Sequence, residues 1–288
     1  MKGDVHELAP TTSDPAEGLV ALLEQLTDLP THPGAALGIL SVIDDPRSSA
    51  SDLARLVDAD PALSARVLRL ANSVVYGLSR QVASAQVAVT VIGFETVRSL
   101  AVLAASGAFS ADGSEAPDGF WGHSIAVASG SAVVARRRGI PANDAFSAGL
   151  LHDLGGALLY KVDPQLAIDL DDEVRENPAE RLDRELMVYG MHHGDAGACV
   201  LDAWGFPATM VEVLREHHCT PVAETSDLVR VVRAGEALAA LGGAPVLLEG
   251  TPDTEEALEA VGLHVGDCDD LSRQVAGEAE SLVNLLLG

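Results

Sequence analysis

Apolar side chains recur at every third or fourth position along most of the chain, which is the pattern of amphipathic helices. Two dipeptides, Asp14-Pro15 and Asp60-Pro61, give the start signal of a helix, an N-cap residue followed by proline at the first helical position. Apolar side chains that share one helical face follow each signal: Leu19, Leu22, Leu23 and Leu26, and then Leu63, Val67 and Leu70. Strand-like alternation is weak, although the β-branched run at 87–91 leaves a strand open there. The pattern predicts an all-α protein.

The same periodicity divides the chain into predicted helices. Their expected ranges are 15–26, 33–43, 50–57, 61–72, 84–92, 94–107, 121–138, 142–160, 179–189, 195–204, 208–217, 226–241 and 270–287. Residues 110–117 are small and polar and include glycine and proline, so they are predicted to form a linker or exposed loop. We therefore expect a flexible tail at 1–14, an N-terminal helical lobe at 15–109, a second helical lobe at 118–242, and a helical C-terminal extension at 243–288.

Composition narrows the choice of partners and compartment. Hydrophobic residues make up 48% of the 288 positions but aromatic residues only 3%, which favours helices packed closely through small side chains. The 18 basic and 43 acidic residues give a net charge of −25, which disfavours direct nucleic-acid binding, although such an excess more often serves solubility alone. No apolar run reaches the roughly 18 residues of a membrane span. With no signal peptide and three cysteines that form no CxxC pair, we expect a cytoplasmic protein without membrane insertion or a disulfide framework.

One short segment carries candidate chemistry, because it places His152 and Asp153 side by side in an apolar run that ends in glycine. Such a pair can bind one metal ion or bridge two, or it can remain as a hydrogen-bonded pair in a site that no longer reacts. Imidazole and carboxylate groups bind iron, manganese and zinc, and inward-pointing ligands from several helices are a recurrent way to build a dinuclear site. The other residues that could converge with the pair are His123, Glu185, His193, Asp195, His217 and His218.

Each of these residues also has a purely structural explanation. His123 can be a boundary residue of an amphipathic helix, and Glu185 lies among so many charges that a solvated or capping role is equally open. His192 is expected to face solvent. His217 and His218 close a helix, where the helix dipole alone favours histidine. Only the combination with the His-Asp pair is specific.

Two long stretches resemble the HDOD domain, an all-helical relative of the HD phosphohydrolases. The N-terminal half of that domain resembles 29–33, the segment from Asp60-Pro61-Ala62-Leu63 to Ala71-Asn72-Ser73, and Val91-Ile92-Gly93-Phe94. Its C-terminal half resembles Phe120-Trp121-Gly122-His123-Ser124, 148–155, the Glu185, Gly190, His193 and Gly197 series, Trp204-Gly205-Phe206-Pro207 and His217-His218. The resemblance covers roughly residues 16–242. It implies an HD-domain-like helical bundle with an additional N-terminal helical lobe.

The HDOD domain is similar to the HD-GYP cyclic-di-GMP phosphodiesterases, and that similarity implies a set of metal ligands. Carried onto matching positions, the ligands are His123, His152, Asp153, His193, His217 and His218. Gly235 stands where a late aspartate is expected, and Glu236 is not expected to replace it, because the next residue of a helix points about 100° away. Gly156 stands where active HD-GYP enzymes often carry lysine, and the Gly-Tyr-Pro loop is missing between His218 and Ser226.

The resemblance implies a regulatory HDOD-domain protein of bacterial signal transduction that is non-catalytic and acts through protein–protein or ligand binding. Its partners would be signalling proteins in trans, with a small nucleotide as a further ligand. The alternative is a metal-dependent phosphohydrolase or cyclic-dinucleotide phosphodiesterase that uses the His-Asp site. A third hypothesis, a sensor that binds metal or a nucleotide without turning it over, lies between the two. In each case the cofactor that the ligand set allows is a divalent metal: iron, manganese or zinc.

Overall fold

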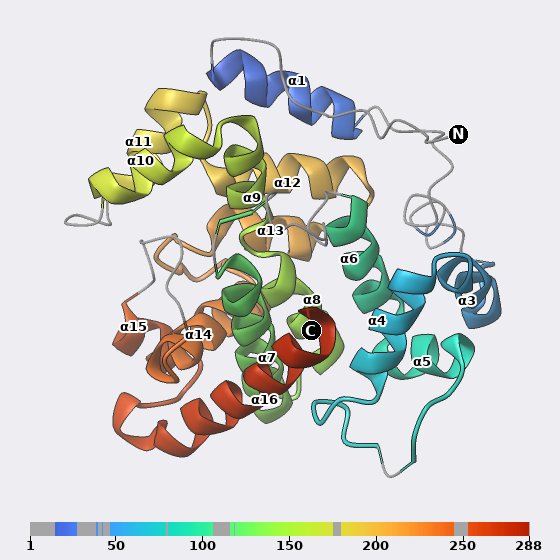
Figure 1. The fold of residues 1–288 in the computed structure, drawn as a ribbon. Helices are drawn as coiled ribbons and strands as arrows, with labels where there is room; N and C mark the ends of the chain where they lie inside the picture. The colour runs from blue at the N-terminus through green and yellow to red at the C-terminus, as the bar shows by residue number, and fades with distance from the viewer. Residues whose placement is uncertain are drawn as a thin grey trace.

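The computed structural model describes residues 15–27, 39, 42, 47–78, 80–105, 116–117, 119–174, 180–244 and 253–287. These residues form helices and turns, with no strand among them (Figure 1), which confirms the all-α prediction. The β-branched run at 87–91 lies in a helix, α5 (Ala85–Ile92). The tail predicted at 1–14, nearly all of the helix predicted at 33–43 and most of the linker at 110–117 lie outside the described residues.

The N-terminal helices begin where the sequence signals predict. Asp60 Oδ1 accepts hydrogen bonds from the backbone N–H groups of Ala62 and Leu63, at 2.9 and 3.1 Å, and so caps the helix that follows. Asn72, at the end of that helix, donates from Nδ2 to the carbonyl of Val82 and accepts the Val82 N–H, which closes the connecting loop. The elements are α1 (Pro15–Thr27), α3 (Ala50–Asp58), α4 (Pro61–Ala71), α5 and α6 (Phe94–Ala105).

The rest of the chain is built around one central helix, α7 (Phe120–Arg138), which is buried from His123 to Ala135. Small side chains let its neighbours approach closely: a Cβ added at Gly130 would overlap the carbonyl oxygen of Gly235 on α14. The other elements are α8 (Ala142–Leu151), α9 (Leu154–Val162), α10 (Pro164–Val174), α11 (Arg181–Tyr189), α12 (His193–Ala203), α13 (Ala208–Glu216), α14 (Asp227–Leu241), α15 (Thr254–Glu259), a 3-10 turn at Val265–Asp267, and α16 (Asp269–Leu287).

The last helix lies across the others. Figure 1 shows α16 running beside α7, with its C-terminal end near α4. Arg69 of α4 donates a hydrogen bond of 2.8 Å to the carbonyl of Leu285. The helix predicted at 270–287 is confirmed, and it links the N-terminal helices to the central bundle.

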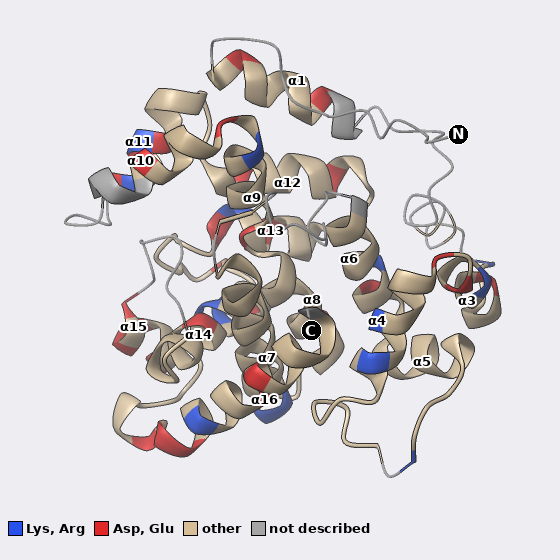
Figure 2. Cartoon of the chain, in the orientation of Figure 1, with Lys and Arg blue, Asp and Glu red and all other residues tan. Residues whose placement is uncertain are grey.

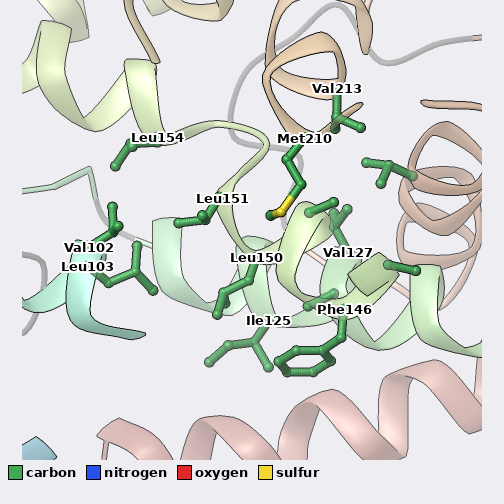
Figure 3. Close-up of a cluster of buried hydrophobic side chains, with 14 of the residues drawn as sticks. Val102, Leu103, Ile125, Val127, Phe146, Leu150, Leu151, Leu154, Met210 and Val213 are labelled. Atoms are coloured by element: carbon green, nitrogen blue, oxygen red, sulfur yellow. The ribbon is translucent and has the colours of Figure 1, made fainter. Parts of the chain in front are cut away.

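The single helix predicted at 142–160 is wrong, because the structure breaks it into α8 and α9 at His152-Asp153. Gly155 lies directly against the backbone of α12, where an added Cβ would overlap the carbonyl oxygen of His193. Leu151 and Leu154, on either side of the break, both insert into the hydrophobic core (Figure 3). The break therefore anchors both helices and turns two consecutive polar side chains toward one point.

Two further expectations can be compared with the structure. No single helix in the described part of the chain is long and apolar enough to cross a membrane; one pair, Ala85–Ile92 with Phe94–Ala104, passes that test jointly but is bent by 106°. The three cysteines are all free, in agreement with the expected lack of a disulfide framework.

Candidate metal centre

The structure brings all six predicted ligand residues together from separate elements. His123 comes from α7, the His152-Asp153 pair from the α8–α9 break, His193 from the start of α12, and His217-His218 from the end of α13. Their ligand atoms form two groups, each with all atoms within 4.8 Å of one another. One group contains Asp153, His193, His217 and His218; the other contains His123, His152 and a residue that was not predicted, Glu236 of α14.

Asp153 joins the two groups. Its Oδ2 lies 3.4 Å from His123 Nε2 and 3.3 Å from His152 Nε2. Its Oδ1 lies 3.2 Å from His217 Nε2 and 3.6 Å from His193 Nε2. A carboxylate whose two oxygens face different sets of imidazoles is suited to bridge two ions.

Three of the histidines are oriented by hydrogen bonds on the side away from the cluster. His152 Nδ1 donates to the Gly149 carbonyl at 2.8 Å, and His217 Nδ1 donates to the Leu214 carbonyl at 2.9 Å. His193 Nδ1 donates to Glu185 Oε2 at 2.7 Å. Such outer hydrogen bonds fix the tautomer of a metal-binding histidine and leave its Nε2 lone pair for the metal.

The spacing of the inner nitrogens suits a ligand set. His123 Nε2 and His152 Nε2 lie 3.2 Å apart, and His193 Nε2 and His218 Nε2 lie 2.9 Å apart. Two nitrogens bound to one ion at about 2.1 Å in tetrahedral geometry would lie roughly 3.4 Å apart. The donor set, five imidazoles and two carboxylates, fits divalent iron, manganese or zinc.

The expectation that Glu236 points away from the site was wrong. Its side chain is buried, and its carboxylate belongs to the same group of ligand atoms as His123 and His152. Gly235, the position expected to carry the aspartate, instead lies in the crossing of α14 with α7, where an added Cβ would overlap the backbone of Ser131. Because position 235 faces the neighbouring helix, position 236 is the one that faces the cluster.

The two carboxylates of the cluster have opposite electrostatics. Burial alone would raise the pKa of Asp153, but the charge of His152 and hydrogen bonds from His123, His152 and His217 outweigh it and hold that pKa well below its ordinary value. Burial raises the pKa of Glu236 to about 7, only partly opposed by His123 and His217. At neutral pH Asp153 is therefore ionised, while the pKa of Glu236 lies close to the ambient pH.

Glu185 is buried and supports the site, so the alternative interpretation that its side chain is solvated was wrong. Besides the His193 ring, its carboxylate accepts the His193 backbone N–H at 2.8 Å and Arg181 Nε at 2.7 Å. Burial opposes its ionisation, but His193 and Arg181 together lower its pKa to about 2. The sequence signal for this role is its place eight residues before His193.

The candidate Asp195 lies outside the cluster, as does His192, which was expected to face solvent. Asp195 is 40% exposed, with its carboxylate 3.4 Å from Arg215 Nε and 3.1 Å from His192 Nε2. The His192 side chain is 24% exposed and accepts the Asp195 backbone N–H through Nδ1 at the start of α12. Both residues therefore belong to the cap of α12.

A small cavity of about 10 Å³ lies beside Glu185, which bonds His193 on the side away from the cluster. Gly156, Arg181, Glu185 and Tyr189 are among the residues that line it. This volume is room for at most about one water molecule. Gly156, which stands where a lysine was expected, lines this cavity without a charge. Arg181 also lines it, and its Nε is ion-paired with Glu185.

The same architecture occurs in known proteins. A family model for the HDOD domain matches residues 29–220. An uncharacterized protein of Treponema pallidum (strain Nichols) is 25% identical over 205 residues, which are 70% of this chain but only 40% of that protein, so the chain spans less than half of this curated relative. The crystal structure of a "Putative phosphohydrolase" from Shewanella amazonensis SB2B has a TM-score of 0.70 and 26% identity, covering 94% of this chain and 98% of that one. An HDOD domain protein of unknown function from Geobacter sulfurreducens shares the fold, with a TM-score of 0.68, 21% identity and coverage of 94% and 98%.

Proposed function

Because this chain belongs to the HDOD domain family, we propose that it is a regulatory protein whose His/Asp/Glu cluster holds two divalent metal ions without turning over a substrate. One ion would be held by His193, His217 and His218 and the other by His123, His152 and Glu236, with Asp153 shared between them. Bound there, the ions would supply Lewis acidity and a water of lowered pKa.

Burial of the ligands is the observation that carries this proposal. Six of the seven ligand residues are at most 3% exposed, and His218 is half-buried. A phosphate substrate must place an oxygen on the ions to react. Ligands enclosed to this extent favour an ion that holds helices together over one that exchanges substrates.

The charges around the cluster also favour a regulatory role. Phosphoryl transfer is stabilised by cations aimed at the phosphate oxygens. The buried cations next to the cluster, Arg181 and Arg233, face Glu185 and backbone carbonyls instead.

In this proposal the metal acts on the folded state. The ligands come from α7, the α8–α9 break, α12, α13 and α14, so two ions would cross-link most of the central bundle. Metal that binds only the folded chain stabilises it in proportion to the logarithm of its concentration over its Kd. The surface so stabilised would be presented to signalling proteins in trans, and a small nucleotide is the further ligand that we propose.

The second candidate function is a metal-dependent phosphohydrolase, which includes cyclic-dinucleotide phosphodiesterases. A specific observation favours it: Glu236 supplies the second carboxylate that the glycine at position 235 lacks. The name of the Shewanella amazonensis relative points in the same direction. In this function the two ions would activate a water for attack on phosphorus.

Metal analysis combined with hydrolysis assays separates the two functions. The full chain would be loaded with iron, manganese or zinc and assayed on a phosphomonoester and on cyclic dinucleotides, beside D153N and the control D195N, whose side chain is partly exposed and outside the cluster. We expect about two ions per chain in the wild type and in D195N, and no turnover above that of D153N. Turnover that D153N loses and D195N keeps would establish the enzyme instead.

A further inference from the structure

Arg233 is the most deeply buried cation next to the cluster. It lies on α14 one helical turn before Glu236, and its side chain is 2% exposed. Its Nη1 donates a hydrogen bond of 3.2 Å to the carbonyl of His217 and another to the carbonyl of Cys219. One guanidinium nitrogen therefore holds the backbone on both sides of His218.

The other end of the same guanidinium faces the C-terminal extension. Arg233 Nη2 lies 3.6 Å from Glu256 Oε1 on α15, which is outside the matched HDOD segment at 29–220. Figure 2 shows acidic residues of α15 beside α14, and the two helices pack together. Arg233 thus joins three parts of the molecule: the turn that carries two metal ligands, the helix that carries Glu236, and α15.

A guanidinium has five N–H donors in a rigid planar fork, so its orientation is set by all of its acceptors together. Turning Arg233 would displace the carbonyls of His217 and Cys219, and with them the imidazoles whose Nε2 atoms face the cluster. Glu256, with a side chain 41% exposed, is the acceptor most open to change.

We propose that Arg233 is a positioning residue of the metal centre and that Glu256 orients it, so that α15 tunes the affinity of the cluster for metal. This inference rests on the proposed metal binding. If it holds, a partner that moves α15 would change how much metal the cluster binds. Conversely, metal bound in the cluster would change the surface that α15 presents.

A purely structural role for Arg233 makes a different prediction. The carbonyls of His217 and Cys219 lie at the end of α13, where any cation is favoured by the helix dipole. In that case removing the partner Glu256 would alter the free energy of unfolding but would leave metal affinity unchanged in the folded protein. Affinity is therefore the readout that separates the two roles.

The test uses the full chain, stripped of metal and titrated with Mn²⁺ by isothermal titration calorimetry. We expect E256Q to weaken binding roughly fivefold, the upper range for a partly exposed ion pair. R233K, which keeps the charge but loses the fork, is expected to weaken binding on the order of tenfold. The matched control is E255Q, because Glu255 is the exposed neighbour of Glu256 on α15. Folded E256Q and R233K with wild-type affinity would overturn the inference; if R233K does not fold, E256Q alone decides.

A second readout keeps the test independent of metal binding. In metal-free protein labelled with ¹⁵N-histidine, we expect the ring resonances of His217 and His218 to shift in E256Q and to remain in place in E255Q. If the wild type binds no Mn²⁺, the proposed function fails, and these resonances still decide whether Glu256 positions the histidines. Unchanged resonances in E256Q would overturn the positioning role.

Discussion

The α8–α9 break and the middle of α14 each bring one carboxylate to the same cluster, but they do so by opposite means. At Asp153 the helix is interrupted, so that two consecutive side chains point to one place. At Glu236 the helix is unbroken, and close contact between Gly235 and α7 fixes which face turns inward. The first arrangement leaves a mark in the sequence, since His and Asp are adjacent. The second depends on how two helices cross, which no local pattern records.

The two carboxylates also differ in what they contribute. Asp153 has imidazole nitrogens near both oxygens and a low pKa, whereas Glu236 has a pKa of about 7. Glu185 raises the pKa of His193 despite its burial, so metal entering the cluster would displace protons both from Glu236 and from His193. We expect Asp153 to be required for both ions and Glu236 for one.

Substitution of the two carboxylates is the strongest test of this difference. D153N should lose both ions, with affinity reduced by more than about 100-fold, because the bridging ligand is gone. E236Q should keep the ion held by His193, His217 and His218, so its metal content should fall to about half. Elemental analysis by mass spectrometry after gel filtration measures both. Equal metal content in the two variants would remove the distinction between the carboxylates.

Adding a methyl group at the α7–α14 crossing tests why the carboxylate comes from position 236. G235A should destabilise the protein by about 3 kcal/mol, since its Cβ would overlap the Ser131 backbone and the helices would have to separate. G277A is the matched control, because Gly277 is an exposed residue of α16 whose added Cβ meets nothing within 4 Å. That substitution should be neutral or stabilise by up to about 1 kcal/mol. Urea unfolding measures both; a G235A variant as stable as G277A would show that the crossing is looser than described.

The pH dependence of metal-free protein gives a smaller effect. The pKa of Glu236 is raised from 4.5 to about 7, so the fold favours its neutral form. Its contribution to stability is complete below about pH 4.5 and is lost as pH rises through about 7. The amide that E236Q introduces stays neutral at every pH, so this variant should gain stability relative to the wild type between pH 5 and 8, by about 2 kcal/mol.

A suitable control for that measurement is E224Q, since Glu224 is exposed on the loop before α14. It makes the same Glu-to-Gln change of net charge, so the pH dependence specific to Glu236 is the difference between the two variants. A pH-independent difference between E236Q and the wild type would mean that Glu236 is not enclosed in the cluster. With saturating metal the sign should reverse, because the wild type then has one more ligand.

Much of the fold was accessible from local patterns. The Asp-Pro signals at 14–15 and 60–61 begin helices, as predicted. Another Asp-Pro, at 163–164, begins α10, which was not predicted; Asp163 Oδ1 accepts the Leu166 N–H there at 3.0 Å. The signal was present, but a segment of mixed polarity follows it, so periodicity alone did not identify the helix.

In the candidate site, most ligand residues were predictable from the sequence, but the backbone geometry that positions them was not. Six ligand residues were proposed from the motif order, and the structure brings all six together. The break at His152-Asp153 was missed, since its causes are contacts of Gly155 with α12 and of leucines with the core. Glu236 was missed for a related reason: the rotation of a helix is set by its packing partner, and a one-residue offset cannot be judged without it.

Anomalous diffraction from crystals of the Mn²⁺-loaded protein tests the central claim most directly. We predict two manganese peaks on either side of Asp153, one within about 2.3 Å of ligand atoms of His193, His217 and His218, the other within the same reach of His123, His152 and Glu236. No peak in the cluster, or peaks only at exposed carboxylates, would contradict the account.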